Sequence, residues 1–211
     1  MPGPHYAISE AFIVLAAIWS TIFLSRTGHR LAALGCAIFG CAAAIGVYRF
    51  GAGEISELAG FHKDFSQIGG SIAMALISAQ FLLAEPLVNR TAVGRWAIWA
   101  AVIVSAMFAC AVPTLTTPLF IIWLSVAIIA AALIPASTIA GRLSLAALVS
   151  VFLINLLLIR QSPQLGPDLS WHLFHILVAL WLLAIVYIFE YRRSDGEAAI
   201  QDDIPAVTKC D

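Results

Sequence analysis

The chain has 211 residues, of which 62% are hydrophobic and only 11% are charged, and its formal net charge is −1. An ordinary soluble domain is about 25% charged and about half apolar. This composition therefore excludes a typical soluble domain and indicates a protein that faces lipid over much of its surface. The near-zero net charge and the lack of a basic run also argue against a nucleic-acid partner.

Seven apolar runs follow one another along the chain, each close to the length of about 20 residues that a bilayer core requires. Pro, Gly and charged residues separate them, and the weakest division is the turn between Pro113 and Pro118. If that turn did not form, six spans would remain. We therefore predict an all-α polytopic bundle of seven transmembrane helices over residues 1–193. Its spans are expected at about 7–25, 31–50, 65–84, 96–112, 118–133, 139–159 and 169–189.

The distribution of Lys and Arg predicts the orientation of the bundle, because cytoplasmic loops carry an excess of both. With the N-terminus outside, Arg49, Lys63 and Arg160 lie on the outer side, and the other eight of the 11 basic residues lie on the inner side. Residues 194–211 are polar and acidic and are expected to form a disordered cytoplasmic tail. The compact loops are typical of a prokaryotic chain, so we expect the bacterial cytoplasmic (inner) membrane.

Ionisable residues inside membrane segments are costly, which makes them candidates for a functional site. In the predicted topology most of them lie at the outer ends of four spans, whereas the inner ends carry ordinary flanking arginines. These outer residues are Glu10 on the first span, Arg49 at the end of the second, His62, Asp64 and Ser66 at the start of the third, and His172 and His175 on the seventh.

His172 and His175 are the basis of a metal hypothesis. Residues three apart on a helix are neighbours on one surface, so both imidazoles can point into the bundle. A catalytic zinc ion typically has three protein ligands and one bound water, and His62 is the natural third ligand. Such a zinc ion would lower the pKa of its water and polarise a carbonyl group. Asp64 or Glu10 would then serve as the general acid or base.

Each of these residues also has a structural interpretation. The histidines can form hydrogen bonds with neighbouring helices and lipid head groups. Arg49 can be an interfacial side chain that reaches toward water, or it can bind a lipid phosphate. Glu10 is either paired with a basic group or protonated.

The run Ser170-Trp-His-Leu-Phe-His-Ile-Leu-Val resembles the seventh helix of the CREST superfamily, which includes alkaline ceramidases and the adiponectin/progestin receptors. Two histidines are four residues apart in that helix. His175 matches the second, whereas the first falls on Trp171, one residue before His172. The family's histidine at the end of the second helix falls on Arg49, and Asp64 matches its aspartate. A serine near the second and third helices also belongs to the family site. Ser66 is a candidate catalytic residue of this chain, although its place in a stripe of small residues on the third span also suits close helix packing. The resemblance implies zinc-dependent hydrolysis of a lipid amide.

The leading hypothesis is therefore a membrane protein with a His/acid site at its outer face, which acts on a lipid amide or ester by zinc-dependent hydrolysis if it is an enzyme. The alternative is a non-catalytic protein that binds a lipid or small molecule, or a helper subunit. A channel or transporter is a third reading, which the mid-membrane residues Gln80 and Asn155 keep open. Membrane lipids are the expected partners, and the sequence leaves the oligomeric state open.

Overall fold

The computed structural model describes residues 3–84, 91–133 and 139–202, with the backbone alone for 192–202. Seven helices in this part of the chain are long and apolar enough to cross a membrane, which confirms the prediction of an integral membrane protein with an all-α seven-helix bundle. Their α-helical parts belong to α1 (Tyr6–Arg26), α2 (Arg30–Gly51), α3 (Ala59–Ala84), α5 (Ala92–Ala111), α6 (Thr116–Leu133), α7 (Ile139–Ile154) and α8 (Pro167–Asp202), of which α8 is a candidate span only as far as Tyr191. A 3₁₀ turn, η1 (Pro113–Leu115), precedes α6, and a π-helical turn, η2 (Asn155–Ile159), continues α7.

The turn between the fourth and fifth spans separates them as predicted. Helix α5 ends at Ala111, and Pro113 opens η1. Proline has no backbone N–H and cannot continue the preceding helix. The hydroxyl of Thr116 donates a hydrogen bond to the carbonyl of Pro113 at 2.8 Å, which joins the 3₁₀ turn to α6.

Two boundaries differ most from the sequence expectation. Helix α3 begins at Ala59, six residues before the predicted start at residue 65, so His62 and Asp64 lie on the helix. Helix α8 continues to Asp202 through the start of the segment expected to be disordered from residue 194. Ala, Glu and Gln are good helix formers, and they let an established helix extend. Residues 203–211 of that expected tail lie outside the described residues.

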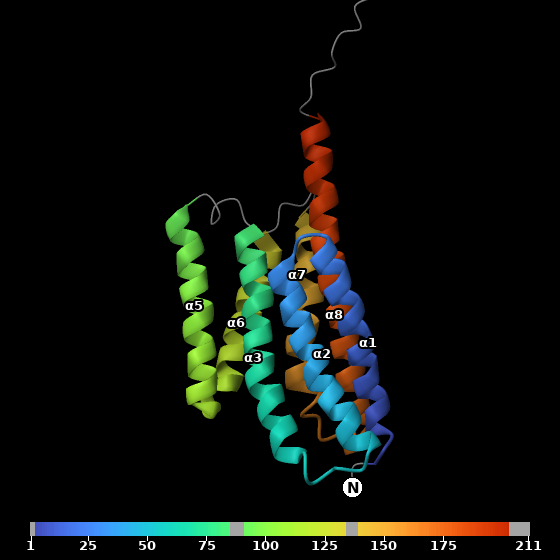
Figure 1. The fold of residues 1–211 in the computed structure, drawn as a ribbon. Coiled ribbons are helices and arrows are strands. Elements are labelled where there is room, and N and C mark those ends of the chain that lie inside the picture. Colours follow the sequence, from blue (N-terminus) through green and yellow to red (C-terminus); the bar gives the residue numbers. More distant parts are fainter. Residues whose placement is uncertain (1–2, 85–90, 134–138, 203–211) are drawn as a thin grey trace, which may run out of the picture.

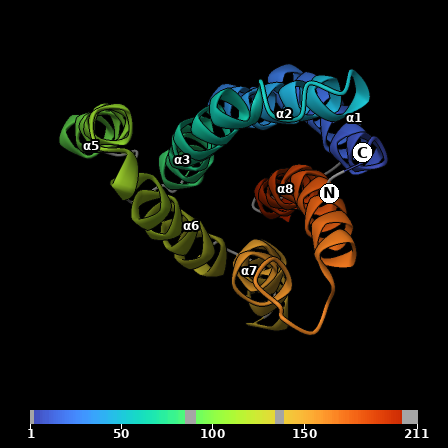
Figure 2. The same cartoon turned by 90° about the horizontal axis from the view of Figure 1, so that it is seen from below.

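Seen along its axis, the bundle has its helices arranged in a ring (Figure 2). The order around the ring is α1, α2, α3, α6, α7 and α8, and packing of α8 on α1 closes it. Helix α5 lies outside the ring and packs mainly on α3. The first residues of α1 lie at the same end as the starts of α3 and α8, which we call the N-terminal end (Figure 1).

Glycines on α2 allow its close approach to both neighbouring helices. A methyl group at Gly35 would lie 2.7 Å from the carbonyl oxygen of Ala73 on α3, and one at Gly40 would lie 2.8 Å from Cβ of Ala17 on α1. Small residues at helix contacts are typical of membrane bundles, because packing and not the hydrophobic effect holds helices together in lipid.

Polar side chains in the middle of the bundle bridge helices. The Ser20 hydroxyl donates to the carbonyl of Leu182 at 3.2 Å, and the Ser78 hydroxyl donates to that of Trp123 at 2.7 Å. The outward faces are apolar instead, as Leu15, Trp96 and Met107 illustrate with exposed fractions of 65%, 73% and 65%. An apolar exterior with polar groups turned inward is the arrangement that a bilayer demands.

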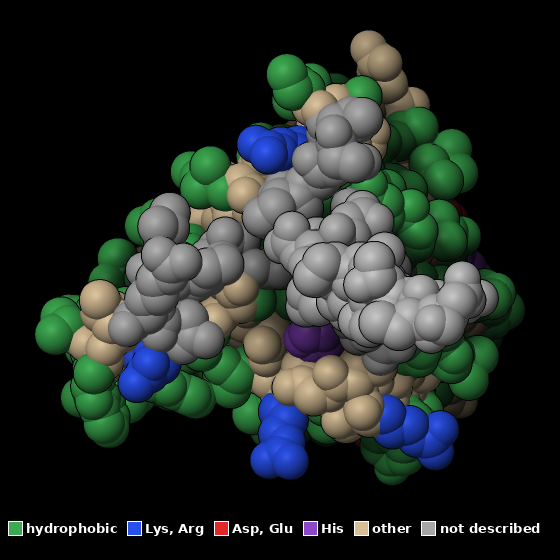
Figure 3. All heavy atoms as spheres, turned by 90° about the horizontal axis from the view of Figure 1, so that it is seen from above, with side chains coloured by type: hydrophobic (Ala, Val, Ile, Leu, Met, Phe, Trp, Pro, Cys, Tyr) green, Lys and Arg blue, Asp and Glu red, His purple; other side chains and the backbone are tan. Residues whose placement is uncertain are grey.

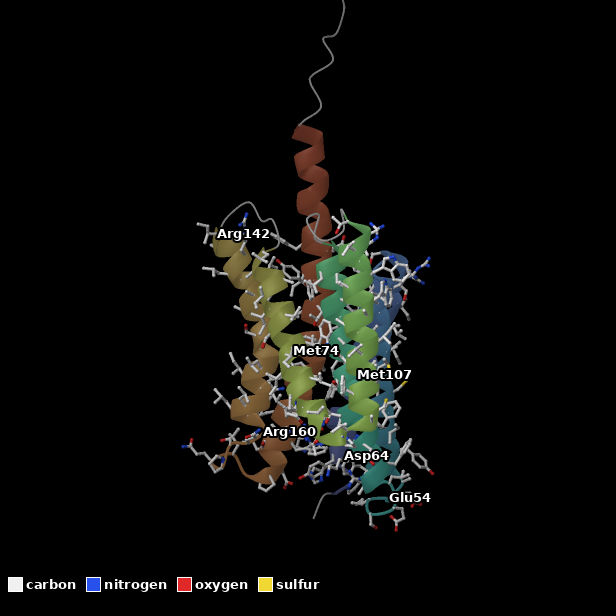
Figure 4. The ribbon with its side chains drawn as sticks, turned by 90° about the vertical axis from the view of Figure 1, so that its left-hand side faces the viewer. Glu54, Asp64, Met74, Met107, Arg142 and Arg160 are labelled. Carbon is white, nitrogen blue, oxygen red and sulfur yellow. The ribbon has the colours of Figure 1, made fainter. Side chains whose placement is uncertain are left out.

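The end of the bundle opposite the N-terminal end carries exposed basic side chains (Figure 3). Arg26, Arg30, Arg95 and Arg142 belong to the helix ends on that side. Arg142 and Arg160 lie at opposite ends of the molecule (Figure 4). This distribution agrees with the Lys/Arg count from which the orientation was predicted, and the orientation itself stays a prediction.

The contact at Gly35 leads to a prediction about stability. We expect Gly35→Ala to lower the apparent melting temperature in detergent, because overpacking of a tight contact costs about 1–3 kcal/mol. The matched control is Gly60→Ala on α3, where a new methyl group has no atom within 4 Å and the melting temperature should not fall. An unchanged melting temperature in Gly35→Ala would mean that α2 and α3 do not pack this closely.

Candidate binding cavity

A cavity of about 860 Å³ opens inside the ring of helices at the N-terminal end. Binding sites for small molecules typically enclose about 300–1,000 Å³, so its size suits a ligand. Its apolar part is rich in aromatic rings from α2, α6, α7 and α8. The polar and charged lining residues lie closer to the N-terminal end: Glu10, Arg49, His62, Lys63, Ser66, Gln67, Thr116, Thr117, Arg160, Gln161, Ser162, Ser170, Trp171 and His175.

Glu10 on α1 is the only carboxylate that lines this cavity within the described part of the chain. It is 2% exposed. Its Oε1 atom lies 3.3 Å from Nε2 of His175 and 3.8 Å from Nε2 of His62. Neither contact has the geometry of a hydrogen bond, and Oε1 has no hydrogen-bond partner among the described residues. A buried acceptor in this state is uncommon and requires an explanation.

A glycine on α2 makes room for the carboxylate. A methyl group at Gly46 would lie 2.5 Å from Oε1 of Glu10 and 2.6 Å from its Cδ atom. Any larger residue would therefore displace the Glu10 side chain. The close approach of α1 and α2 at this level places a carboxyl group inside the bundle.

Contacts on the side of each ring away from Glu10 determine which ring nitrogen carries the hydrogen. Nδ1 of His175 lies 2.7 Å from the carbonyl oxygen of Trp171. A carbonyl only accepts, so this Nδ1 carries a hydrogen. Nδ1 of His62 lies 3.3 Å from Nη1 of Arg49. Arginine only donates, so this Nδ1 accepts and the hydrogen of a neutral His62 is on Nε2.

Two contacts hold Arg49 in place at the cavity, so it is not simply an interfacial side chain that reaches toward water. Its Nε donates to the carbonyl of Ile55 at 2.9 Å, and its guanidinium lies 4.9 Å from the ring centroid of Phe50. These contacts join the end of α2 to the loop that follows it. The charge of Arg49 therefore remains next to His62.

Arg160 comes from a different part of the chain and depends on the π-helical turn η2. The backbone N–H of Arg160 donates to the carbonyl of Asn155 at 3.0 Å, and the Ser170 hydroxyl donates to the carbonyl of Ile159 at 2.7 Å. The guanidinium lies 4.8 Å from the ring centroid of Phe174. π-Helical turns are rare and frequent at functional sites.

Arg160 is solvent-accessible at the rim of the cavity, yet the surrounding helices remove part of its hydration. This desolvation lowers the pKa of the guanidinium, and the negative charge of Glu10 opposes the shift. Arginine remains protonated in proteins. Arg160 therefore contributes a permanent positive charge to the rim.

Of the predicted catalytic residues, Ser66 lines the cavity and Asp64 does not. Ser66 lines the cavity, one turn after His62 on the same face of α3. Asp64 is exposed and does not belong to the lining. Successive residues of a helix are about 100° apart, so Asp64 lies on roughly the opposite side of α3 from His62. It lies at the N-terminal end of the molecule, beside the loop that holds Glu54 (Figure 4).

His172 belongs to a separate cluster. Its Nδ1 lies 3.1 Å from the hydroxyl of Ser9, which itself donates to the carbonyl of Tyr6 at 3.1 Å. The His172 ring is 5.3 Å from that of His5, measured between centroids. Tyr6 in turn donates a hydrogen bond to Asp168 at the start of α8. This cluster ties the start of α1 to the start of α8.

The predicted zinc ligands His62, His172 and His175 do not form one centre in this structure. Among the described residues, no group of three or more His, Cys, Asp or Glu side chains could hold a metal ion. The contact of Arg49 with His62 gives a physical reason, because it leaves the hydrogen of a neutral His62 on the nitrogen that a metal would need. The residues present therefore do not fit the zinc site, and metal-assisted hydrolysis stays a prediction.

Sequence reasoning missed several residues of the cavity. Arg160 was counted only among the basic residues of the outer side, and Gly46 carries no local signal because its role depends on Glu10 from another helix. Trp171 was noted only as a position in the family comparison. Its ring lies tilted against that of His175 with a centroid distance of 4.3 Å, and its Nε1 is buried without a partner among the described residues. The spacing of four residues between Trp171 and His175 is the one signal that could have indicated their contact.

Comparison with known proteins gives no further support for any family: no family model, no curated protein and no solved structure matches the chain.

The hydrogen-bond partners of the two cavity histidines predict their tautomers. In ¹⁵N NMR spectra of histidine-labelled protein at about pH 8, where an ordinary histidine is neutral, His62 should carry its hydrogen on Nε2 and His175 on Nδ1. His62→Gln and His175→Gln assign the signals. Arg49→Leu should relax the preference of His62, whereas Arg26→Leu at the opposite end should not. A wild-type His62 with its hydrogen on Nδ1 would contradict the contact with Arg49.

Proposed function

We propose that this integral membrane protein binds an amphipathic small molecule with an anionic head group in the cavity at the N-terminal end of the bundle. The observation that carries the proposal is the charge of the cavity lining. Arg49, Lys63 and Arg160 are cationic, and Glu10 is the one carboxylate among the described lining residues. Clustered cations favour anionic ligands such as phosphates and carboxylates.

The order of residues along the helices supports a ligand with one polar and one apolar end. On α2, Arg49 lies near the N-terminal end, and Phe39 lines the cavity ten residues earlier, which is about 15 Å deeper. On α8, Ser170 and Trp171 come first and Val178 lies about two turns deeper. A head group at the level of Arg49 would therefore leave its chain among Phe39, Phe120 and Phe152.

This proposal selects the binding alternative over hydrolysis. Both nitrogens of His175 and both of His62 already face protein groups, so neither imidazole is positioned as a free general base. Binding of a lipid or a lipid-like metabolite is enough to explain a cavity with a charged rim and an aromatic interior. No chemical reaction has to be assumed.

The test is equilibrium binding of radiolabelled tetradecyl phosphate to the protein in phosphatidylcholine nanodiscs. We expect saturable binding that weakens with added salt, because rim charges are screened, and much weaker binding of uncharged tetradecanol. The double variant Lys63→Gln/Arg160→Gln should raise Kd by roughly ten-fold or more, since two contacts of about 1 kcal/mol each are lost.

The matched control is Arg26→Gln/Arg142→Gln, which removes two exposed cations at the opposite end of the bundle and should leave Kd unchanged. Equal affinity for tetradecanol and tetradecyl phosphate would refute the proposal. So would a Lys63→Gln/Arg160→Gln variant that binds as the wild type does, or one that binds no more weakly than the control.

A further inference from the structure

Glu10 remains unexplained by a ligand that is only an anion with an apolar tail. A carboxylate that lines the cavity would repel an anionic head group, and its Oε1 atom is buried without a hydrogen-bond partner among the described residues. Leaving a buried acceptor unpaired costs free energy. Its position next to the cavity makes a ligand group the natural partner.

We infer that the ligand carries a hydroxyl group about one helical turn deeper than its anion, and that this hydroxyl donates a hydrogen bond to Oε1 of Glu10. The inference rests on the proposed function and specifies its ligand. It follows from three features of the cavity: the depth of Glu10, the charges around it, and the direction of the neighbouring imidazoles.

The depth follows from the contacts on α2. The Glu10 carboxylate lies against Gly46, which is three residues, or about 4.5 Å, deeper along α2 than Arg49. An anion held by Arg49 therefore places the next part of the ligand beside Glu10. Beyond that level, Ala42, Ala43 and Phe39 leave only apolar surface on this helix.

The charges select a neutral donor over a cationic one. An ammonium group at Glu10 would lie among Arg49, Lys63 and Arg160 and beside two imidazoles, so it would gain one attraction and meet several repulsions. A hydroxyl donates a hydrogen bond without adding charge. It also accepts, and the indole N–H of Trp171, a residue of the same lining, is a buried donor without a partner among the described residues.

The imidazoles leave Glu10 open to such a donor. His175 lies 3.3 Å from Oε1 of Glu10, but this contact does not have the geometry of a hydrogen bond, so His175 does not satisfy the carboxylate. His62 does face Glu10 with its hydrogen on Nε2, but at 3.8 Å it is beyond hydrogen-bond distance. A hydroxyl group between the anion and the apolar chain of the ligand would therefore donate to Oε1 of Glu10, with which neither imidazole forms a hydrogen bond.

The experiment compares two probes that differ in one hydroxyl. These are myristoyl lysophosphatidic acid, whose glycerol hydroxyl lies between phosphate and chain, and its analogue without that hydroxyl. Both are measured against the wild-type protein in phosphatidylcholine nanodiscs. We expect the hydroxylated probe to bind roughly ten-fold more tightly, as is typical for a hydrogen bond to a charged acceptor.

Two variants assign the preference to a residue. Glu10→Gln keeps the shape of the side chain but weakens the acceptor, and charge-assisted hydrogen bonds are about twice as strong as neutral ones. The preference should therefore fall to about three-fold, while binding of the deoxy analogue, which reports an intact site, does not weaken. The matched control Asp64→Asn changes an exposed acid at the same end and should retain the full preference.

The possible outcomes separate this inference from the proposal on which it rests. Equal binding of the two probes by the wild type would overturn the hydroxyl but leave the anionic amphiphile in place. Failure of both probes to bind would overturn both. A full preference retained in Glu10→Gln would show that the hydroxyl bonds elsewhere, and it would overturn the role of Glu10.

Discussion

The contact between Glu10 on α1 and Gly46 on α2 is the constraint on which the polar end of this bundle depends. A carboxylate in an apolar interior is tolerated only where neighbouring polar groups compensate for its lost hydration. Gly46 admits the side chain, and His62 and His175 bring two imidazoles to the same oxygen. Helices α1, α2, α3 and α8 are therefore coupled at one level, and the polar part of the cavity is built around that level.

The groups around this centre are themselves fixed by contacts outside it. Arg49 holds His62 from one side, and the carbonyl of Trp171 holds His175 from the other. The π-helical turn η2 and the Ser170 hydroxyl connect the end of α7 to α8 and position Arg160 over Phe174. Such a second layer of contacts limits the rotation of side chains, which favours a preorganised binding site over an adaptable one. The contact of Arg49 with His62 also leaves the hydrogen of a neutral His62 on the nitrogen that a metal ion would use, and within the described part of the chain no group of three His, Cys, Asp or Glu side chains could hold one.

The residues that line the cavity change in character from its rim to its interior. Cations lie at the rim, one carboxylate lies about a turn deeper, and aromatic rings fill the end within the bundle. A ligand that matches all three levels has an anion, a neutral donor and an apolar chain in that order. The opposite end of the bundle has exposed arginines, and buried polar groups in the middle of the bundle, such as Ser20 and Ser78, bond to neighbouring helices. The polar residues at the two ends thus differ in their surroundings: at the N-terminal end they line the cavity, and at the opposite end the arginines are exposed.

The sequence by itself determined the class of the protein, the number of spans and most of their boundaries. These depend on hydrophobic length and on breakers such as Pro113, which are local properties of the chain. It also identified Glu10, Arg49, His62, Ser66 and His175, because a polar residue in an apolar run is conspicuous. Only the tertiary structure decided which of them meet. Asp64 lies on a different side of α3 from His62, and His172 lies on a different side of α8 from His175. Which side faces the cavity depends on the helices packed around it, and the sequence does not show those helices. Gly46, Trp171 and Arg160 gained their roles from partners on other helices, which no local pattern contains.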